Sequence, residues 1–584
     1  MSQSESRERL DLIPPQTYKY SSAISSLSLG QGMPKITPES PFDLKQALER
    51  LDLSPNDTWT WAALPEAKPE DLPDLVARLK TRPTSAVLYT LIPFLGQNSE
   101  ATEALYSLGR EKAAHLYEGI PPVLVLDPDR IQIEPAWNKI RSLNREKLIP
   151  ITDLPHIKTP IPKHLLPNDQ ERPTVLIQVI KEVYDRELRN LNTAVSENVG
   201  TSMRNISPEN TIEQVTQNPI LQSVTQGQRI IQIPFCGTYA LVLPWKVDWK
   251  VNFDRINYHV TGMTGCSGKG LSPEATTASG FMELAERISA IVGATPGWPR
   301  GYKSIDRMMQ AKYSELNSEN VSVLDPNSLS PKVTYQDQEI YWIKAQLSLP
   351  DKNGDVQEIW VPAQKVFHFP NLDEFEFVRD TSNGLASGNT LEEAKLHALL
   401  EIIERDGCYT TFITNKKIFS LPPDTTDELG KIIATYHNKG LKPGFIDLTT
   451  DFGVPTYRAY LRLSDGNILT GSGAHLNGRI ALNRAICELG AKCIGAINQG
   501  ISLAGQNQQI QERGFSDIPN LSTGNVNADL YLMEKLFELN DYPVIYADLT
   551  RKDINIPVVR AIVPEVDSPF SLTRREVKHF IEAS

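Results

Sequence analysis

Apolar side chains recur with helical spacing in the first third of the chain. One such stripe consists of Leu72, Leu75, Val76 and Leu79, at positions i, i+3, i+4 and i+7. This period is typical of one face of an amphipathic helix. Further helices are predicted over residues 100–118, which lead into a Gly-Ile-Pro-Pro terminator, and over residues 176–191.

This N-terminal third is predicted to contain three kinds of segment. Residues 1–40 are rich in Ser, Gly and Pro, and we expect a flexible N-terminus there. Residues 41–200 are predicted to form a mainly helical region of unknown role, with a proline-rich linker near 155–173. Because no recognisable chemistry falls in this third, the plainest interpretation is a helical module that binds a partner.

The pattern changes near residue 205 to alternating strands and helices, which predicts a mixed α/β region over 205–584. Residues 229–235 and 239–245 are predicted to pair as strands around a Cys-Gly-Thr turn. The other predicted strands are 454–463, 542–549 and 558–566, and the predicted helices are 274–292, 391–406 and 480–496. This region is larger than a typical domain but has no obvious seam.

Composition restricts the function further. The 584 residues carry a net charge of −12, which argues against a general nucleic-acid-binding surface. The best apolar run, residues 86–96, is too short to span a bilayer, and the N-terminus lacks the apolar core of a signal peptide. The five cysteines form no Cys-x-x-Cys pair and the nine histidines no His-x-x-x-His, so free thiols and no zinc site are expected. We therefore expect a cytoplasmic protein without a membrane or nucleic-acid partner.

Two copies of the pattern Glu-x-x-Glu-Arg are the strongest chemical feature of the chain. The glutamates are Glu283, Glu286, Glu401 and Glu404, and the arginines are Arg287 and Arg405. A spacing of i and i+3 places two carboxylates on one helix face, where oxygen ligands suit Mg²⁺. The alternative is that each arginine forms an ordinary i,i+4 ion pair with the first glutamate of its copy.

The segment before the first copy, residues 264–270, contains Ser267 and Lys269 among glycines. Small residues and a lysine ahead of a helix suggest anion binding, although a flexible strand-to-helix turn explains the same pattern. It is not a P-loop, because Met263 stands where the first glycine would fall and Gly270 follows the lysine. Contact of Ser267 or Lys269 with nucleotide or substrate stays open.

The other two flanking segments also have two interpretations. Thr390 is a good N-cap and Glu393 would complete a capping box, while Asn389 could contact a metal or a phosphate. Arg484 and Glu488 stand one helical turn apart, either as an i,i+4 pair or with the arginine directed at phosphate.

Taken together, these ordered motifs resemble the YcaO family over about residues 205–584. The resemblance implies a YcaO-like ATP-binding domain in which the four glutamates hold Mg²⁺ against the triphosphate. It implies nucleotide contacts or completion of the metal shell for Asn389, Glu393, Arg405 and Arg484. The implied activity is ATP-dependent phosphorylation of a backbone amide oxygen in a ribosomally made peptide or protein, giving an azoline (cyclodehydratase) or a thioamide.

The resemblance also implies a peptide or protein substrate, a leader-peptide-binding or TfuA-like partner, and compatibility with a homodimer. The alternative is a catalytically quiet YcaO-like scaffold that binds a partner or leader peptide. Two departures bear on the product and the site. Residues 570–584 contain no proline, whereas azoline-forming members often have a proline-rich tail, and Ala491 stands where the family often has Gln.

Overall fold

The computed structural model describes most of residues 40–116 and 206–566, with short gaps, and two strands at residues 16–23 and 35–38. The predicted linker at 155–173, the predicted helix at 176–191 and the tail at 570–584 lie outside the described residues. Mixed antiparallel sheets and helices fill the described part, so the predicted α/β class is confirmed.

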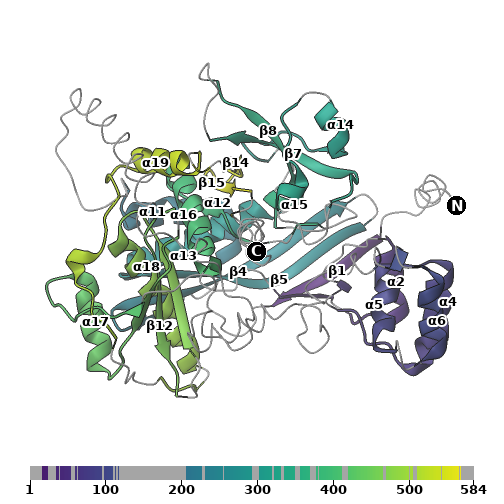
Figure 1. Cartoon of the computed structure of the whole chain (residues 1–584), viewed down its shortest axis with the longest axis horizontal. Coiled ribbons are helices and arrows are strands. Elements are labelled where there is room, and N and C mark those ends of the chain that lie inside the picture. The colour runs from purple at the N-terminus through teal and green to yellow at the C-terminus, as the bar shows by residue number, and fades with distance from the viewer. Residues whose placement is uncertain are drawn as a thin grey trace, which may run out of the picture.

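The N-terminal helices form a group of their own at one end of the molecule (Figure 1). They are α2 (Leu44–Leu53), α4 (Leu72–Thr81), α5 (Ser85–Leu91) and α6 (Ser99–Ser107). Leu75, Val76 and Leu79 are buried, which confirms the predicted stripe. The helix predicted over 100–118 is interrupted, because α6 ends at Ser107 and Gly109 adopts a left-handed conformation with φ of +79°.

The first sheet joins strands from residues 16–38 to strands from residues 231–270. Its order is β2 (Lys35–Pro38), β1 (Gln16–Ala23), β5 (Ile256–Gly270), β4 (Thr238–Phe253) and β3 (Ile231–Phe235). β1 pairs with β5 in parallel, so the expectation of flexibility for residues 1–40 is wrong for the two strands. The predicted hairpin turn is confirmed, with Cys236 and Gly237 both at positive φ, as a two-residue turn between twisted strands requires.

Two further sheets complete the structure. One has the order β10 (Ile418–Phe419), β11 (Gly444–Asp447), β12 (Thr456–Arg462) and β13 (Ile468–Ala474). The other has the order β6 (Met309–Ala311), β7 (Ile340–Leu347), β14 (Ile545–Asp548), β15 (Val558–Ile562) and β9 (Leu385–Ser387), with β8 (Glu358–Pro362) paired to β7. These strands confirm the three predicted beyond residue 450.

Three long helices cover these sheets and position the site. They are α13 (Pro273–Ala290), α16 (Leu391–Thr410) and α18 (Gly478–Asn498), close to the predicted ranges. α13 packs on β5 and β9, α16 on β9, β15 and β13, and α18 on β12 and β13. The other α-helices among the described residues beyond residue 205 are α11 (Pro208–Gln217), α12 (Pro219–Thr225), α14 (Tyr313–Ser318), α15 (Ala363–Val366), α17 (Glu428–Asn438) and α19 (Val526–Glu538).

Residues 264–270 belong to β5, so the flexible turn considered for them is wrong. Glycine is required at position 268, because a Cβ there would lie 2.1 Å from the carbonyl oxygen of Thr276 in α13. The strand and the helix therefore approach closely, which places Ser267 beside the first Glu-x-x-Glu-Arg copy. None of the helices among the described residues is both long and apolar enough to cross a membrane.

Candidate functional site

The first Glu-x-x-Glu-Arg copy lies in the second half of α13. Arg287 is nearly buried and contacts both glutamates of its copy, with Nη2 3.1 Å from Glu283 Oε1 and Nη1 3.4 Å from Glu286 Oε1. The other carboxylate oxygen of Glu283 accepts from the backbone N–H of Ser267 at 2.9 Å and from its hydroxyl at 3.1 Å. Arg287 Nη1 also lies 3.4 Å from His368 Nε2. The first copy is therefore held on several sides.

The second copy lies in α16 and repeats the arginine geometry more loosely. Arg405 Nη2 lies 3.5 Å from Glu401 Oε1, and Nη1 lies 3.5 Å from Glu404 Oε1. The Arg405 side chain is 37% exposed, against 11% for Arg287. The i,i+4 ion pairs considered from the sequence are thus present in both copies, and each arginine also contacts the second glutamate.

Residues at the start of α16 cap the N-terminus of this helix. The Thr390 hydroxyl accepts from the Glu393 N–H at 3.1 Å, which confirms Thr390 as a cap. Glu393 Oε2 accepts from the backbone N–H of Asn389 at 2.9 Å, so the box closes one residue earlier than predicted. Asn389 Oδ1 accepts from the Thr211 hydroxyl at 2.9 Å, which ties α11 to this turn.

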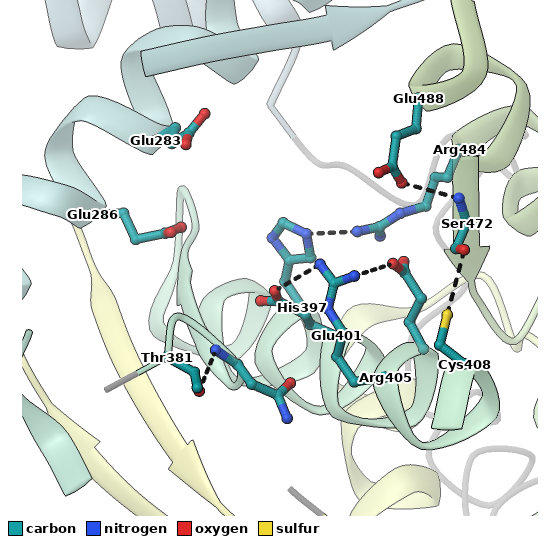
Figure 2. Close-up of polar contacts among 12 residues, drawn as sticks. Glu283, Glu286, Thr381, His397, Glu401, Arg405, Cys408, Ser472, Arg484 and Glu488 are labelled. Carbon is teal, nitrogen blue, oxygen red and sulfur yellow. Dashed lines mark hydrogen bonds and ion pairs between the residues drawn. The ribbon is translucent and has the colours of Figure 1, made fainter. Parts of the chain in front are cut away.

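Arg484 of α18 meets α16 rather than its own helix. Its Nη2 lies 2.7 Å from His397 Nε2, and His397 precedes Glu401 by one helical turn. The ion pair considered between Arg484 and Glu488 is not formed among the described residues, so that alternative is wrong. Figure 2 shows Glu283 and Glu286 of α13 on one side of the site and Arg484 and Glu488 of α18 on the other. Glu401 and Arg405 of α16 lie between them.

Glu488 instead has its own set of partners. Lys492 Nζ lies 3.0 Å from Oε1, and Lys269 Nζ of β5 lies 3.9 Å from Oε2. The backbone N–H of Ser472 in β13 donates to Oε2 at 2.9 Å. Burial acts to raise the pKa of Glu488, but the positive charges of Lys269 and Lys492 outweigh it and the pKa is strongly lowered. Glu488 is therefore an ionised anchor between β5, β13 and α18.

The two glutamate pairs are electrostatically connected across α13 and α16. Burial raises the pKa of Glu286 to about 8; Arg287 opposes this, while the charges of Glu401 and Glu283 add to it. Burial is also the main reason why the pKa of Glu401 is raised, with Arg405 opposing it. The charge of Glu401 in one pair therefore acts on the ionisation of Glu286 in the other.

Arg560 of β15 is a further buried cation near these pairs. Its guanidinium group donates hydrogen bonds to the backbone carbonyl oxygens of Val366 at 3.0 Å, Thr381 at 2.8 Å and Asn383 at 2.9 Å. Its charge acts to lower the pKa of both Glu286 and Glu401. It thus fixes the loop that leads into β9 while balancing charge in the site.

Sequence reasoning missed the part played by His397, Lys492 and Arg560. The first two lie one helical turn from predicted site residues, His397 before Glu401 and Lys492 after Glu488, so the i±4 rule could have found them. Arg560 gave no local signal, because its partners lie nearly 200 residues away in the chain.

The residue types fit Mg²⁺, which prefers oxygen ligands. Among the described residues no three acidic, histidine or cysteine side chains form a ready metal cluster. Mg²⁺ usually takes only one or two carboxylates and completes its shell with water and phosphate oxygens. Each helix offers one such pair, with arginines nearby for phosphate.

Antiparallel sheets, three converging helices and paired carboxylates facing basic side chains define a class of α/β protein with an acidic site and no P-loop. The match to a family model then identifies the protein family. The chain belongs to the YcaO family, whose model, described as YcaO cyclodehydratase, ATP- and Mg²⁺-binding, matches residues 267–567.

The chain is also similar to the following proteins. An uncharacterized protein of Methanothermobacter thermautotrophicus is 32% identical over 349 residues, which cover 54% of this chain and 85% of that protein. An uncharacterized protein in the tfuA 3′ region of Rhizobium leguminosarum bv. trifolii is 27% identical, over 39% of this chain and 55% of that protein. The structure of YcaO from Methanopyrus kandleri bound with AMPPCP and Mg²⁺ has a TM-score of 0.46 and 19% identity, and the match covers 65% of this chain and 96% of that chain.

Proposed function

We propose that this chain binds ATP and Mg²⁺ at the two glutamate pairs and uses them to phosphorylate a backbone amide oxygen in a ribosomally made peptide or protein. The observation that carries the proposal is the meeting of the two Glu-x-x-Glu-Arg copies on α13 and α16. Both copies lie inside the segment that the family model matches. Buried carboxylates gathered in this way favour a cationic ligand.

In the proposed division of roles, Glu283, Glu286, Glu401 and Glu404 hold the metal. Arg405 and Arg484 face the phosphates, and Arg287 stays with its own glutamates because it is nearly buried. Mg²⁺, when bound, neutralises charge on the phosphoryl groups. Asn389 and Glu393 act through the start of α16, since their contacts fix that helix terminus.

The proposed reaction converts a poor leaving group into a good one. A nucleophile adds to the amide carbonyl carbon, and the resulting oxyanion takes the γ-phosphoryl group from ATP, which releases ADP. The C–O bond then breaks, and phosphate leaves with the former amide oxygen. Attack by a Cys, Ser or Thr side chain of the substrate gives an azoline with net loss of water. Attack by sulfide gives a thioamide, in which sulfur replaces oxygen.

Between these two products, the rhizobial relative favours the thioamide, because its place beside tfuA points to a TfuA-like partner. A catalytically quiet scaffold is the competing function. It does not explain the four glutamates, because peptide or partner binding needs no such buried cluster of negative charge.

Nucleotide binding and product mass test this proposal. We expect the wild-type chain to bind ATP with Mg²⁺ and E286Q/E404Q to lose that binding. Mass spectrometry of a co-expressed candidate peptide, with a TfuA-like protein present, then distinguishes loss of water from exchange of oxygen for sulfur. Absence of nucleotide binding by the wild type, with partner and peptide added, would refute the enzyme.

A further inference from the structure

The contact between Arg484 and His397 fixes the state of the histidine. A guanidinium group has only donors, so His397 Nε2 must accept the 2.7 Å hydrogen bond. An acceptor at Nε2 places the ring proton on Nδ1 and leaves the imidazole neutral. Figure 2 shows the bond joining α16 to α18 across the site.

This partner distinguishes Arg484 from the other arginines of the helices. Arg287 and Arg405 each contact two glutamates, which largely cancel their charge. In the described part of the chain Arg484 forms no ion pair with a carboxylate, and the nearby Glu488 is taken by Lys492 and Lys269. A neutral imidazole can orient a guanidinium without neutralising it, so the positive charge stays available to an anion.

His397 also shares a helix face with the second glutamate pair. It stands four residues before Glu401 and eight before Arg405, and all three side chains lie on the α16 side of the site. One rigid helix therefore sets the place of a proposed metal ligand and of the group that orients Arg484. Rigid support of this kind is what a preorganised phosphate site requires.

We propose that His397 is a positioning residue that holds Arg484, with its charge uncompensated, toward the phosphates of the nucleotide. This inference rests on the proposed function, and it adds a residue and a mechanism to it. His397 itself need not touch the nucleotide, because it acts through the guanidinium.

A double-mutant cycle with a binding readout tests this role. Calorimetric titration with AMPPCP and Mg²⁺ compares the wild type, H397A, R484A and H397A/R484A in the full chain. We expect H397A and R484A each to weaken binding on the order of tenfold, as loss of a hydrogen bond to a charged group does. The double variant should bind no more weakly than R484A, because His397 acts only through Arg484.

Matched variants separate this effect from a loss of folding. H397Q keeps an acceptor oxygen and should bind within about twofold of the wild type. H437A removes a histidine from α17, outside the site, and should change nothing. If H397A melts early, H397L, which keeps the volume but not the acceptor, takes its place in the cycle.

The two failures are distinguishable. If the wild type binds AMPPCP and H397A binds equally well, the positioning role is wrong and the proposed function stands. Equal weakening by H397A in the wild-type and R484A backgrounds would also overturn it, because His397 would then act independently. If the wild type binds no AMPPCP with Mg²⁺, the proposed function itself fails.

Discussion

The two Glu-x-x-Glu-Arg copies have the same sequence pattern but different surroundings. In α13, Arg287 is nearly buried, His368 lies beside it, and Glu283 accepts two hydrogen bonds from Ser267. In α16, Arg405 is 37% exposed, and its contacts with both glutamates are 3.5 Å long. Among the described residues, Glu401 and Glu404 have no hydrogen bond or ion pair except with Arg405.

This difference indicates that one motif serves two purposes. The α13 copy is a fixed wall whose charges are largely satisfied within the protein. The α16 copy holds its carboxylates with weak contacts that a ligand can replace, since partly exposed ion pairs contribute little stability. A ligand site needs charged groups whose contacts within the protein are easily replaced. We therefore expect catalytic activity to depend most on the α16 copy and the free energy of unfolding to depend most on the α13 copy.

The largest expected effect is therefore on activity in α16. We expect E401Q or E404Q to lower product formation at least about a hundredfold, because a neutral amide is a poor substitute for a carboxylate facing a cation. Circular dichroism and thermal unfolding should show an intact fold. Global unfolding of these variants would mean that the pair is structural, and it would remove the contrast with α13.

Replacing the arginine should lower the free energy of unfolding more in the α13 copy than in the α16 copy. We expect R287M to lower the free energy of unfolding by about 3–5 kcal/mol, because two largely buried carboxylates lose their partner. R405M removes a cation that is 37% exposed and should cost less than R287M. Urea unfolding of the two variants side by side makes the comparison. Equal losses would show that both copies are committed to the fold.

The α13 copy should also make stability depend on pH. The folded pKa of Glu286 is about 8, above its ordinary value of 4.5, so the folded state holds a proton that the unfolded state releases between these values. Its contribution to stability is fully present below pH 4.5 and is lost as pH rises through about 8. Mg²⁺ favours the ionised carboxylate, so it should raise the melting temperature more above this pKa than below it.

Variants of two buried carboxyls check the assignment of this pH effect. E286Q should reduce the pH dependence of the Mg²⁺-induced shift in melting temperature, and the raised pKa of Glu401 accounts for what remains. Glu534 of α19 is the matched control, because burial raises its pKa to about 7 outside the site. E534Q should alter the pH dependence of stability and leave the response to Mg²⁺ unchanged. A response to Mg²⁺ that E286Q leaves intact would contradict the metal role of Glu286.

The sequence could predict these helices and glutamate pairs because both depend on short spacings. The i, i+3 and i, i+4 rules place Glu401, Glu404 and Arg405 on one face wherever the helix lies. The same rules allowed an Arg484–Glu488 pair that is not formed, and they could not find Lys269, a partner of Glu488 from a strand more than 200 residues earlier. Contacts between helices depend on packing of distant segments, and no local pattern encodes them.

The glycines of residues 264–270 also show that local sequence does not reveal contacts with distant segments. Residues 264–270 have the composition of a turn, yet they form a strand in which Gly268 permits close packing against α13. Composition reports that a residue is small, and only the fold shows which neighbour needs the space.

The smallest expected effect concerns the bonds that set the α13 copy apart. S267A removes the hydroxyl bond to Glu283 but keeps the stronger backbone N–H bond at 2.9 Å. We expect AMPPCP binding in the presence of Mg²⁺ to weaken less than about fivefold, since one neutral donor of two is lost. S279A, which removes a hydroxyl on the same helix that lies 3.5 Å from the Lys269 N–H, is the control and should have no effect. A loss as large as that of E401Q would mean that Ser267 touches the ligand directly and does not act only through Glu283.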